Sequence, residues 1–85
     1  MITKKMTITI PSGLEARPVA LLVQVASQFE SNIHIQCENK QVNAKSIMGM
    51  MSLGIAAGEE VEVTIQGSDE EAAMKKIEEY LNSPQ

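Results

Sequence analysis

Apolar and polar residues alternate in three segments of this 85-residue chain. The even positions from 2 to 10 are apolar with one exception, and the same two-residue period runs through 33–38 and 61–66. This period is typical of β-strands that bury only one face. A shorter strand is expected around 41–43, after a tight turn at Asn39-Lys40. Because each strand has a single apolar face, we predict a four-stranded, mainly antiparallel sheet.

Two longer segments have apolar residues at the spacing of α-helices. The first segment begins at Pro18, which suits the first turn of a helix because it has no N–H to donate. The second follows Ser68, which is predicted to form a capping box with Glu71. A third, short helix is expected between Ser46, a candidate N-cap, and Gly54, a candidate C-cap. The predicted order is β-α-β-β-α-β-α, an α+β open-faced β-sandwich with its three helices on one side of the sheet.

The composition narrows the classes of function. Acidic residues outnumber basic ones by 11 to 7, and the resulting net charge of -4 argues against nucleic acid as a direct partner and against an anionic membrane. No apolar run reaches the roughly 20 residues that would span a bilayer. Cys37 is the only cysteine, so the chain forms no internal disulfide and fits a cytoplasmic location. We expect a single domain, residues 1–85, with no cofactor and no metal.

The segment from Asn43 to Leu53 is the strongest candidate for a functional surface. Met48 and Met51 share one side of the short predicted helix, whereas Met50 points the other way and can enter the core. Three methionines in one short turn cannot all face inward, and exposed methionine is common at adaptable binding surfaces. A phosphate on Ser46 would lie next to this apolar surface. The alternative is that Ser46 serves only as an N-cap.

The outer side of the first long helix is a second candidate surface. Leu21 and Val25 lie there, and two large apolar residues are more than a solvated helix face needs. Either they form a contact surface, or they pack at the edge of the core.

Two motifs resemble the HPr family, the histidine-containing phosphocarriers of the bacterial sugar phosphotransferase system. Residues 13–18, Gly-Leu-Glu-Ala-Arg-Pro, resemble the active-site turn of that family. Residues 43–49, Asn-Ala-Lys-Ser-Ile-Met-Gly, resemble its regulatory serine segment. The similarity covers nearly the whole chain, and the two motifs lie at the family's separation. The resemblance therefore implies the HPr-like form of the open-faced β-sandwich.

The chain departs from the family at the residue that accepts the phosphoryl group. Glu15 stands where the family has its acceptor histidine, which takes and returns a phosphoryl group as a nucleophile. Phosphorelay through this position is therefore not expected. The only histidine, His34, is predicted to lie on the polar side of the second strand as an ordinary surface residue. This combination resembles the Crh-like subgroup, which lacks the acceptor histidine and keeps the serine, although that subgroup tends to have a neutral residue at position 15.

The resemblance implies a regulatory protein and not an enzyme. HPr kinase/phosphorylase would phosphorylate Ser46, and the phosphorylated form would act as the corepressor of a LacI-type catabolite control regulator. The residues carried over as contacts with the regulator are Arg17, Ala20, Ile47, Met48 and Met51. The alternatives are a phosphocarrier that uses other chemistry, and an interaction module with another regulatory partner. A homodimer formed by strand exchange at a hinge near Pro11 is also compatible with the sequence.

Overall fold

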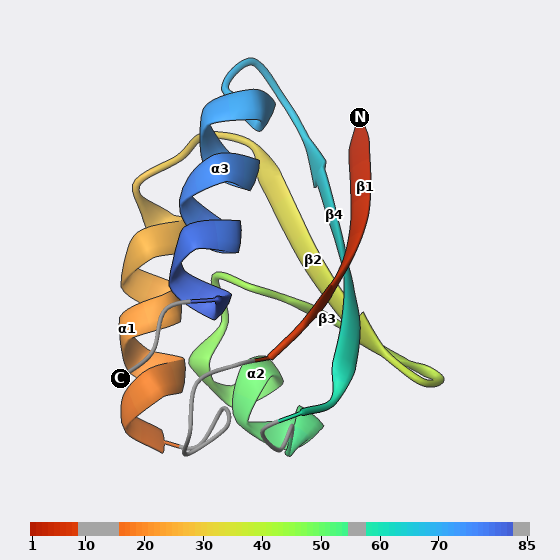
Figure 1. Cartoon of the computed structure of the whole chain (residues 1–85). Helices are drawn as coiled ribbons and strands as arrows, with labels where there is room; N and C mark the ends of the chain where they lie inside the picture. Colours follow the sequence, from red (N-terminus) through yellow and green to blue (C-terminus); the bar gives the residue numbers. More distant parts are fainter. Residues whose placement is uncertain (9–15, 55–57, 83–85) are drawn as a thin grey trace.

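The computed structural model describes residues 1–8, 16–54 and 58–82, and Figure 1 shows the elements within them. Their order is the predicted β-α-β-β-α-β-α. The bounds are β1 Ile2–Thr7, α1 Ala16–Ser27, β2 Asn32–Cys37, β3 Lys40–Asn43, α2 Ile47–Leu53, β4 Glu60–Gln66 and α3 Glu70–Leu81.

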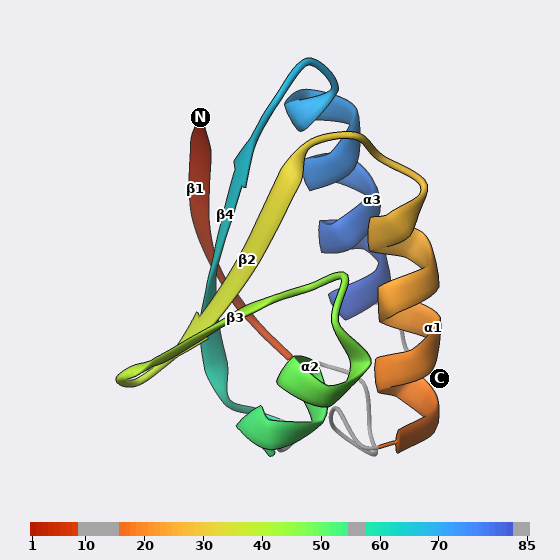
Figure 2. The same cartoon turned by 180° about the vertical axis from the view of Figure 1, so that it is seen from behind.

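The strands form one sheet in the order β1-β4-β2-β3, and every neighbouring pair is antiparallel. Ile33 lies opposite Ile65 and Ile35 opposite Val63, so the apolar residues of adjacent strands face the same side of the sheet. Helices α1 and α3 cover that side, and the short helix α2 lies near the N-terminal half of α1 (Figures 1 and 2). The predicted α+β open-faced sandwich is therefore confirmed.

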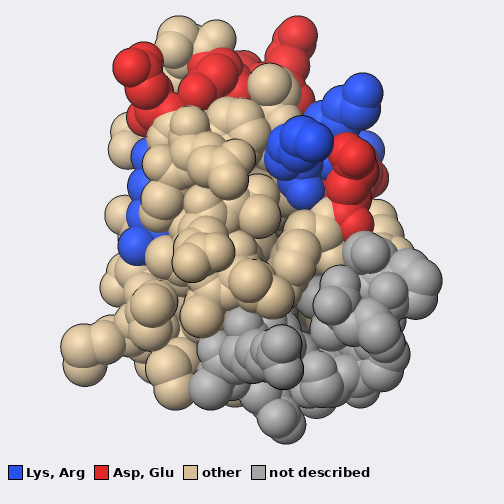
Figure 3. Space-filling model, turned by 90° about the vertical axis from the view of Figure 1, so that its left-hand side faces the viewer, with Lys and Arg blue, Asp and Glu red and all other residues tan. Residues whose placement is uncertain are grey.

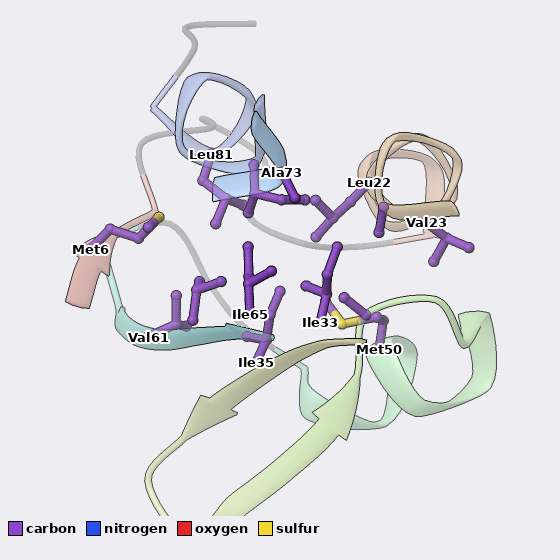
Figure 4. Close-up of a cluster of buried hydrophobic side chains, with 14 of the residues drawn as sticks. Met6, Leu22, Val23, Ile33, Ile35, Met50, Val61, Ile65, Ala73 and Leu81 are labelled. Carbon is purple, nitrogen blue, oxygen red and sulfur yellow. The ribbon is translucent and has the colours of Figure 1, made fainter. Parts of the chain in front are cut away.

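The core lies between this apolar face of the sheet and the helices. In Figure 4, Ile33, Ile35 and Ile65 point from the strands toward the helices, from which Leu22 and Leu81 point back. All five side chains are fully buried. Burial of apolar surface stabilises the fold by about 25 cal/mol per Å². The apolar face of the strands and the apolar faces of the helices thus pack together in one core.

The start of α3 differs from the sequence prediction. The capping box predicted at Ser68 is wrong, because α3 begins at Glu70 with Asp69 at its N-cap. The side chain of Glu70 reaches back to the N–H of Gly67 at 3.1 Å. Asp69 makes no cap hydrogen bond to its own helix. Its carboxylate instead accepts hydrogen bonds from the N–H and the hydroxyl of Ser31, which precedes β2.

The turn between β2 and β3 lies one residue earlier than predicted. Cys37 pairs with Lys40 across the hairpin, which leaves Glu38 and Asn39 as the turn residues. Glu38 has a φ of 56°, in the left-handed region. This conformation costs a residue with a side chain about 1–2 kcal/mol. The pairing of the two strands, which spans the whole hairpin, outweighs that local cost.

Candidate functional site

A hydrogen-bonded turn between β3 and α2 positions Ser46. The carbonyl of Asn43 accepts the N–H of Ser46 at 3.0 Å, and the Asn43 side chain accepts the N–H of Lys45 at 2.8 Å. Ala44 is fully buried, and its N–H donates to the carbonyl of Ile33 at 2.9 Å. The asparagine side chain thus replaces a backbone partner within the turn. Ser46 consequently has a defined place at the start of α2.

Ser46 is the N-cap of α2, as the sequence predicts. Its backbone is extended, with φ -109° and ψ 114°, and its Oγ accepts the N–H of Gly49 at 3.1 Å. Its carbonyl accepts the N–H of Met50 at 2.9 Å, the first hydrogen bond of the helix. The helix ends at Gly54, whose φ of 59° is the left-handed conformation of a glycine C-cap. The residue Ser46 itself is half-buried.

The two sides of α2 have opposite surroundings. Met50 is fully buried and points into the apolar cluster (Figure 4). Met48, Met51 and Ile47 are 84%, 51% and 47% exposed. A helix of seven residues is marginal on its own, so burial of Met50 holds α2 on the protein while the other three side chains remain at the surface. The structure therefore divides the methionines as predicted.

Helix α1 packs against α2 and extends this surface. Leu21 is 41% exposed and Ala20 is half-buried. Val25 is also half-buried, but it packs against the core. Of the two apolar residues on the outer side of α1, Leu21 therefore belongs to the surface and Val25 to the edge of the core. Residues 18–29 contain no charged side chain, and the surface seen from the α1 side is mostly uncharged at its centre (Figure 3).

Lys45 is a residue of this region that sequence reasoning misses. Its ammonium group donates to the backbone carbonyl of Phe29 at 2.7 Å. Phe29 follows the end of α1, so the bond ties the turn before α2 to the end of α1. The two residues are 16 positions apart, and nothing in the local pattern indicates that they meet.

Three residues named from the sequence have side chains outside the described part of the chain. Glu15 lies outside the described residues altogether, as does Pro11, the predicted hinge. Arg17 belongs to the first turn of α1, and its side chain is likewise outside the described part. Among the described residues, Ser46 and the exposed residues of α2 belong to an element that packs against α1.

The single histidine and the single cysteine lie away from α1. His34 is half-buried on the open face of the sheet, between Thr64 and Asn43 in the strand register. Cys37 is half-buried at the edge of the core and not inside it, and its Sγ donates to the carboxylate of Glu59 at 3.4 Å. Burial, and then Glu59, raise the pKa of the Cys37 thiol. The raised pKa keeps the thiol protonated at neutral pH and lowers its reactivity.

The described ranges hold neither a cluster of metal ligands nor a membrane-spanning helix. Within residues 1–8, 16–54 and 58–82, no three His, Cys, Asp or Glu side chains gather in a way that could hold a metal ion. None of the helices in these ranges has the length and apolar character that crossing a bilayer requires.

Comparison with known proteins identifies the relatives of the chain. Residues 2–83 match the family described as PTS HPr component phosphorylation site. The chain belongs to the HPr family. This chain is 44% identical to the HPr-like protein Crh of Bacillus subtilis over 81 residues, and the match covers 95% of each chain. It is 43% identical to Crh of Halalkalibacterium halodurans, covering 95% of this chain and 96% of that one. The resemblance inferred from the two motifs, to HPr and to its Crh-like subgroup, is therefore confirmed.

Solved structures show the same fold. The crystal structure of HPr-C-His from Thermoanaerobacter tengcongensis has a TM-score of 0.93 at 47% identity, covering 98% of this chain and 93% of that one. A crystal structure of Crh from Bacillus subtilis, described there as an intertwined dimer with a swapping domain, has a TM-score of 0.76 at 44% identity, covering 95% and 93%. HPr and Crh are phosphocarrier or regulatory proteins, so this chain belongs to a family that is not enzymatic.

Proposed function

We propose that this HPr-family protein is a regulatory, Crh-like phosphoprotein whose switch is Ser46. HPr kinase/phosphorylase phosphorylates the serine, and the phosphorylated form is the corepressor of a LacI-type catabolite control regulator in the cytoplasm. Residues 1–85 act as one HPr-like domain. The observation that carries the proposal is the position of the Ser46 hydroxyl at the start of a helix whose exposed side is apolar.

The phosphoryl transfer requires only the serine oxygen from this chain. Ser46 Oγ forms a bond to the γ-phosphorus of a nucleoside triphosphate on the kinase, the bond to the departing nucleoside diphosphate breaks, and the serine proton passes to a base on the kinase. The product carries about -1.5 to -2 charge at neutral pH. Ser46 already accepts the N–H of Gly49, and a negative charge at a helix N-terminus is favourable. The fold is therefore kept, and the change is one of surface charge.

The docking surface combines this charge with apolar contacts. Its members lie on α2 and the first half of α1: Arg17, Ala20, Ile47, Met48 and Met51. The exposure of Ile47, Met48 and Met51 supports this assignment. A regulator that offers basic side chains beside an apolar groove gains charge-assisted hydrogen bonds to the phosphate. Flexible methionine side chains adapt to such a groove.

The identity of Glu15 supports a regulatory role over phosphorelay. A glutamate at the position of the acceptor histidine brings a fixed negative charge, whereas the imidazole that carries a phosphoryl group at neutral pH is missing. Incubation with phosphoenolpyruvate and enzyme I of the phosphotransferase system should leave this protein unlabelled. Acid-labile label on the chain would favour the phosphocarrier alternative.

The switch is tested by the affinity of the regulator for four forms of the protein: unmodified, phosphorylated, Ser46→Ala treated with the kinase, and phosphorylated Met48→Asp. Hydrogen bonds to a charged group contribute about 1.5–3 kcal/mol, so phosphorylation should raise affinity about tenfold or more. Ser46→Ala should not respond to the kinase. Met48→Asp should be phosphorylated but bind weakly.

The matched control for Met48→Asp is Gln66→Asp, which adds the same single negative charge at an exposed position of β4. After phosphorylation, the Gln66→Asp protein should bind the regulator as tightly as the phosphorylated protein without a substitution. Equal affinity of the regulator for phosphorylated and unmodified protein would remove the proposed switch. Phosphorylation of Ser46 without any gain in regulator binding would point instead to an interaction module with another regulatory partner.

A homodimer formed by strand exchange is a second state that we propose, on the basis of the Crh crystal structure described as a swapped dimer. In the sheet that the described strands form, β1 lies at an edge beside β4, so its exchange would leave the other strand pairs intact. The predicted hinge at Pro11 lies outside the described residues. Sedimentation at increasing protein concentration tests for the dimer, and a single monomeric species at all concentrations would contradict it.

A further inference from the structure

Gly49 is the third residue of α2, a position where glycine weakens a helix. Glycine inside a helix costs about 1 kcal/mol relative to alanine. A positive φ would explain a glycine, but among the described residues the glycines with positive φ are Gly54, Gly58 and Gly67. The backbone at Gly49 is that of an ordinary helix residue. The use of glycine must therefore depend on the space that its missing side chain leaves.

That space lies directly beside the Ser46 hydroxyl. A Cβ added at Gly49 would be 3.3 Å from Ser46 Oγ and 3.4 Å from the Cβ of Val42. Both distances are tighter than most contacts that Cβ atoms make in proteins, so the neighbouring atoms would have to shift by a few tenths of an ångström. One side of Ser46 Oγ already faces the N–H of Gly49 at 3.1 Å. A methyl group would thus crowd the remaining approaches to the oxygen.

We propose that Gly49 is a specificity-determining residue for phosphorylation of Ser46, because its missing side chain leaves the room that the phosphoryl group needs. This inference rests on the proposed function. During transfer, Ser46 Oγ forms a bond to phosphorus while the nucleoside diphosphate departs, and the oxygens of the phosphoryl group come to surround the serine oxygen. A serine followed three residues later by glycine, at the start of a short helix, is then the chemical class of substrate that the kinase accepts.

Packing of α2 against β3 is the structural role from which this one must be separated, because the same Cβ would approach Val42. The test therefore uses Gly49→Ala, the double variant Gly49→Ala/Val42→Gly, and the control Ser52→Ala. Val42→Gly removes the Cβ that the added methyl group would approach, and it leaves the crowding of Ser46. Ser52 is exposed in the same helix, and its hydroxyl donates to the carbonyl of Gly49 at 2.6 Å. Its replacement by alanine favours the helix without approaching Ser46.

Phosphorylation rates with HPr kinase/phosphorylase are measured for all four proteins after circular dichroism shows that they are folded. The two variants that contain Gly49→Ala should lose at least tenfold in kcat/KM, whereas Ser52→Ala should match the unmodified protein. Gly49→Ala phosphorylated at the unmodified rate would overturn the proposal. Recovery of the full rate in the double variant would also overturn it, since packing against Val42 would then explain the glycine.

A second measurement needs no kinase, and so separates this inference from the proposed function. In a Cys37→Ala background, Ser46→Cys places a thiol at the same position, and its alkylation by iodoacetamide reports access to that atom. Addition of Gly49→Ala should slow alkylation severalfold, and addition of Ser52→Ala should not. Equal alkylation rates with and without Gly49→Ala would refute the steric claim. An unmodified protein that the kinase does not phosphorylate would refute the proposed function while leaving this result to stand.

Discussion

Glu38 occupies a backbone conformation that suits glycine better than glutamate. Its φ of 56° lies in the left-handed region, where a Cβ comes close to the neighbouring carbonyl oxygen. The side chain of Gln36 donates a hydrogen bond to the backbone carbonyl of Glu38 at 3.2 Å. Any residue at position 38 has this carbonyl, so the hydrogen bond does not require glutamate. The strain therefore comes from the presence of a side chain at this position.

We expect Glu38→Gly to raise the free energy of unfolding by about 0.5–1 kcal/mol, since relief of the left-handed strain exceeds the extra chain entropy of glycine. Urea unfolding measures the change. Asn39→Gly is the control, because Asn39 belongs to the same turn but does not have a positive φ. That variant should gain no stability. A Glu38→Gly protein no more stable than the unmodified one would show that the turn is not strained in solution.

Among the elements, α2 depends most on its neighbours. It has seven residues, with a serine cap at one end and a glycine cap at the other. Such a helix is marginal in water without tertiary contacts. Burial of Met50 supplies one contact, and the Lys45–Phe29 hydrogen bond fixes the turn before the helix. The position of the proposed phosphorylation site is thus set by α1 as well as by α2.

Lys45→Met should destabilise the protein by about 1–2 kcal/mol, because a hydrogen bond from a charged donor is lost while the length of the side chain is kept. The matched control is Lys76→Met, which removes the same charge from an exposed position on α3 and should change stability by less than about 0.5 kcal/mol. Chemical denaturation measures both variants. Equal stabilities of the two variants would mean that the contact with Phe29 contributes nothing measurable.

Across the whole molecule, contacts between distant segments join β1 to α3, and the end of β4 to the segment before β2. The N-terminal ammonium group lies 3.0 Å from Glu70, and Lys4 lies 2.8 Å from Glu78, so β1 is linked twice to α3. Where β4 turns into α3, Gly67 packs so closely that an added Cβ would lie 2.6 Å from the Cα of Ser31. Only glycine fits at this junction.

The carboxylate of Asp69 makes the stability of the molecule depend on pH. Hydrogen bonds from the Ser31 hydroxyl, and then from the N–H of Glu30, hold the pKa of Asp69 below its ordinary value. The N–H of Gly67, and then the N-terminal ammonium group, similarly lower the pKa of Glu70. A group with a lowered folded-state pKa stabilises the protein above its unfolded-state pKa, about 4 for these residues. That contribution is lost as the pH falls through the folded-state pKa.

Asp69→Asn should lower the urea midpoint at pH 7, and the gap from the unmodified protein should close as the pH falls below about 4. The variant therefore loses less stability in acid than the unmodified protein does. Glu79→Gln, at an exposed position of α3, is the control for the change in net charge and should leave the acid dependence unchanged. A gap for Asp69→Asn that stays constant from pH 7 to pH 2 would contradict the link to the Asp69 carboxylate.

Local sequence patterns are enough to predict the element order, the inward face of each strand and the two caps of α2. These follow from local rules: alternation marks a strand, a spacing of three or four marks a helix face, and Ser46 and Gly54 cap the helix that they flank. The division between buried Met50 and exposed Met48 also follows from helical geometry.

Which polar groups meet across the fold depends on how the strands and helices pack. Local pattern places a capping box at Ser68, but Asp69 instead accepts hydrogen bonds from Ser31, 38 residues away. The ammonium group of Lys45 finds the carbonyl of Phe29, and Leu21 stays exposed where Val25 packs. Such contacts carry no periodic signal, because they join segments whose proximity exists only after the strands and helices have packed around a common core.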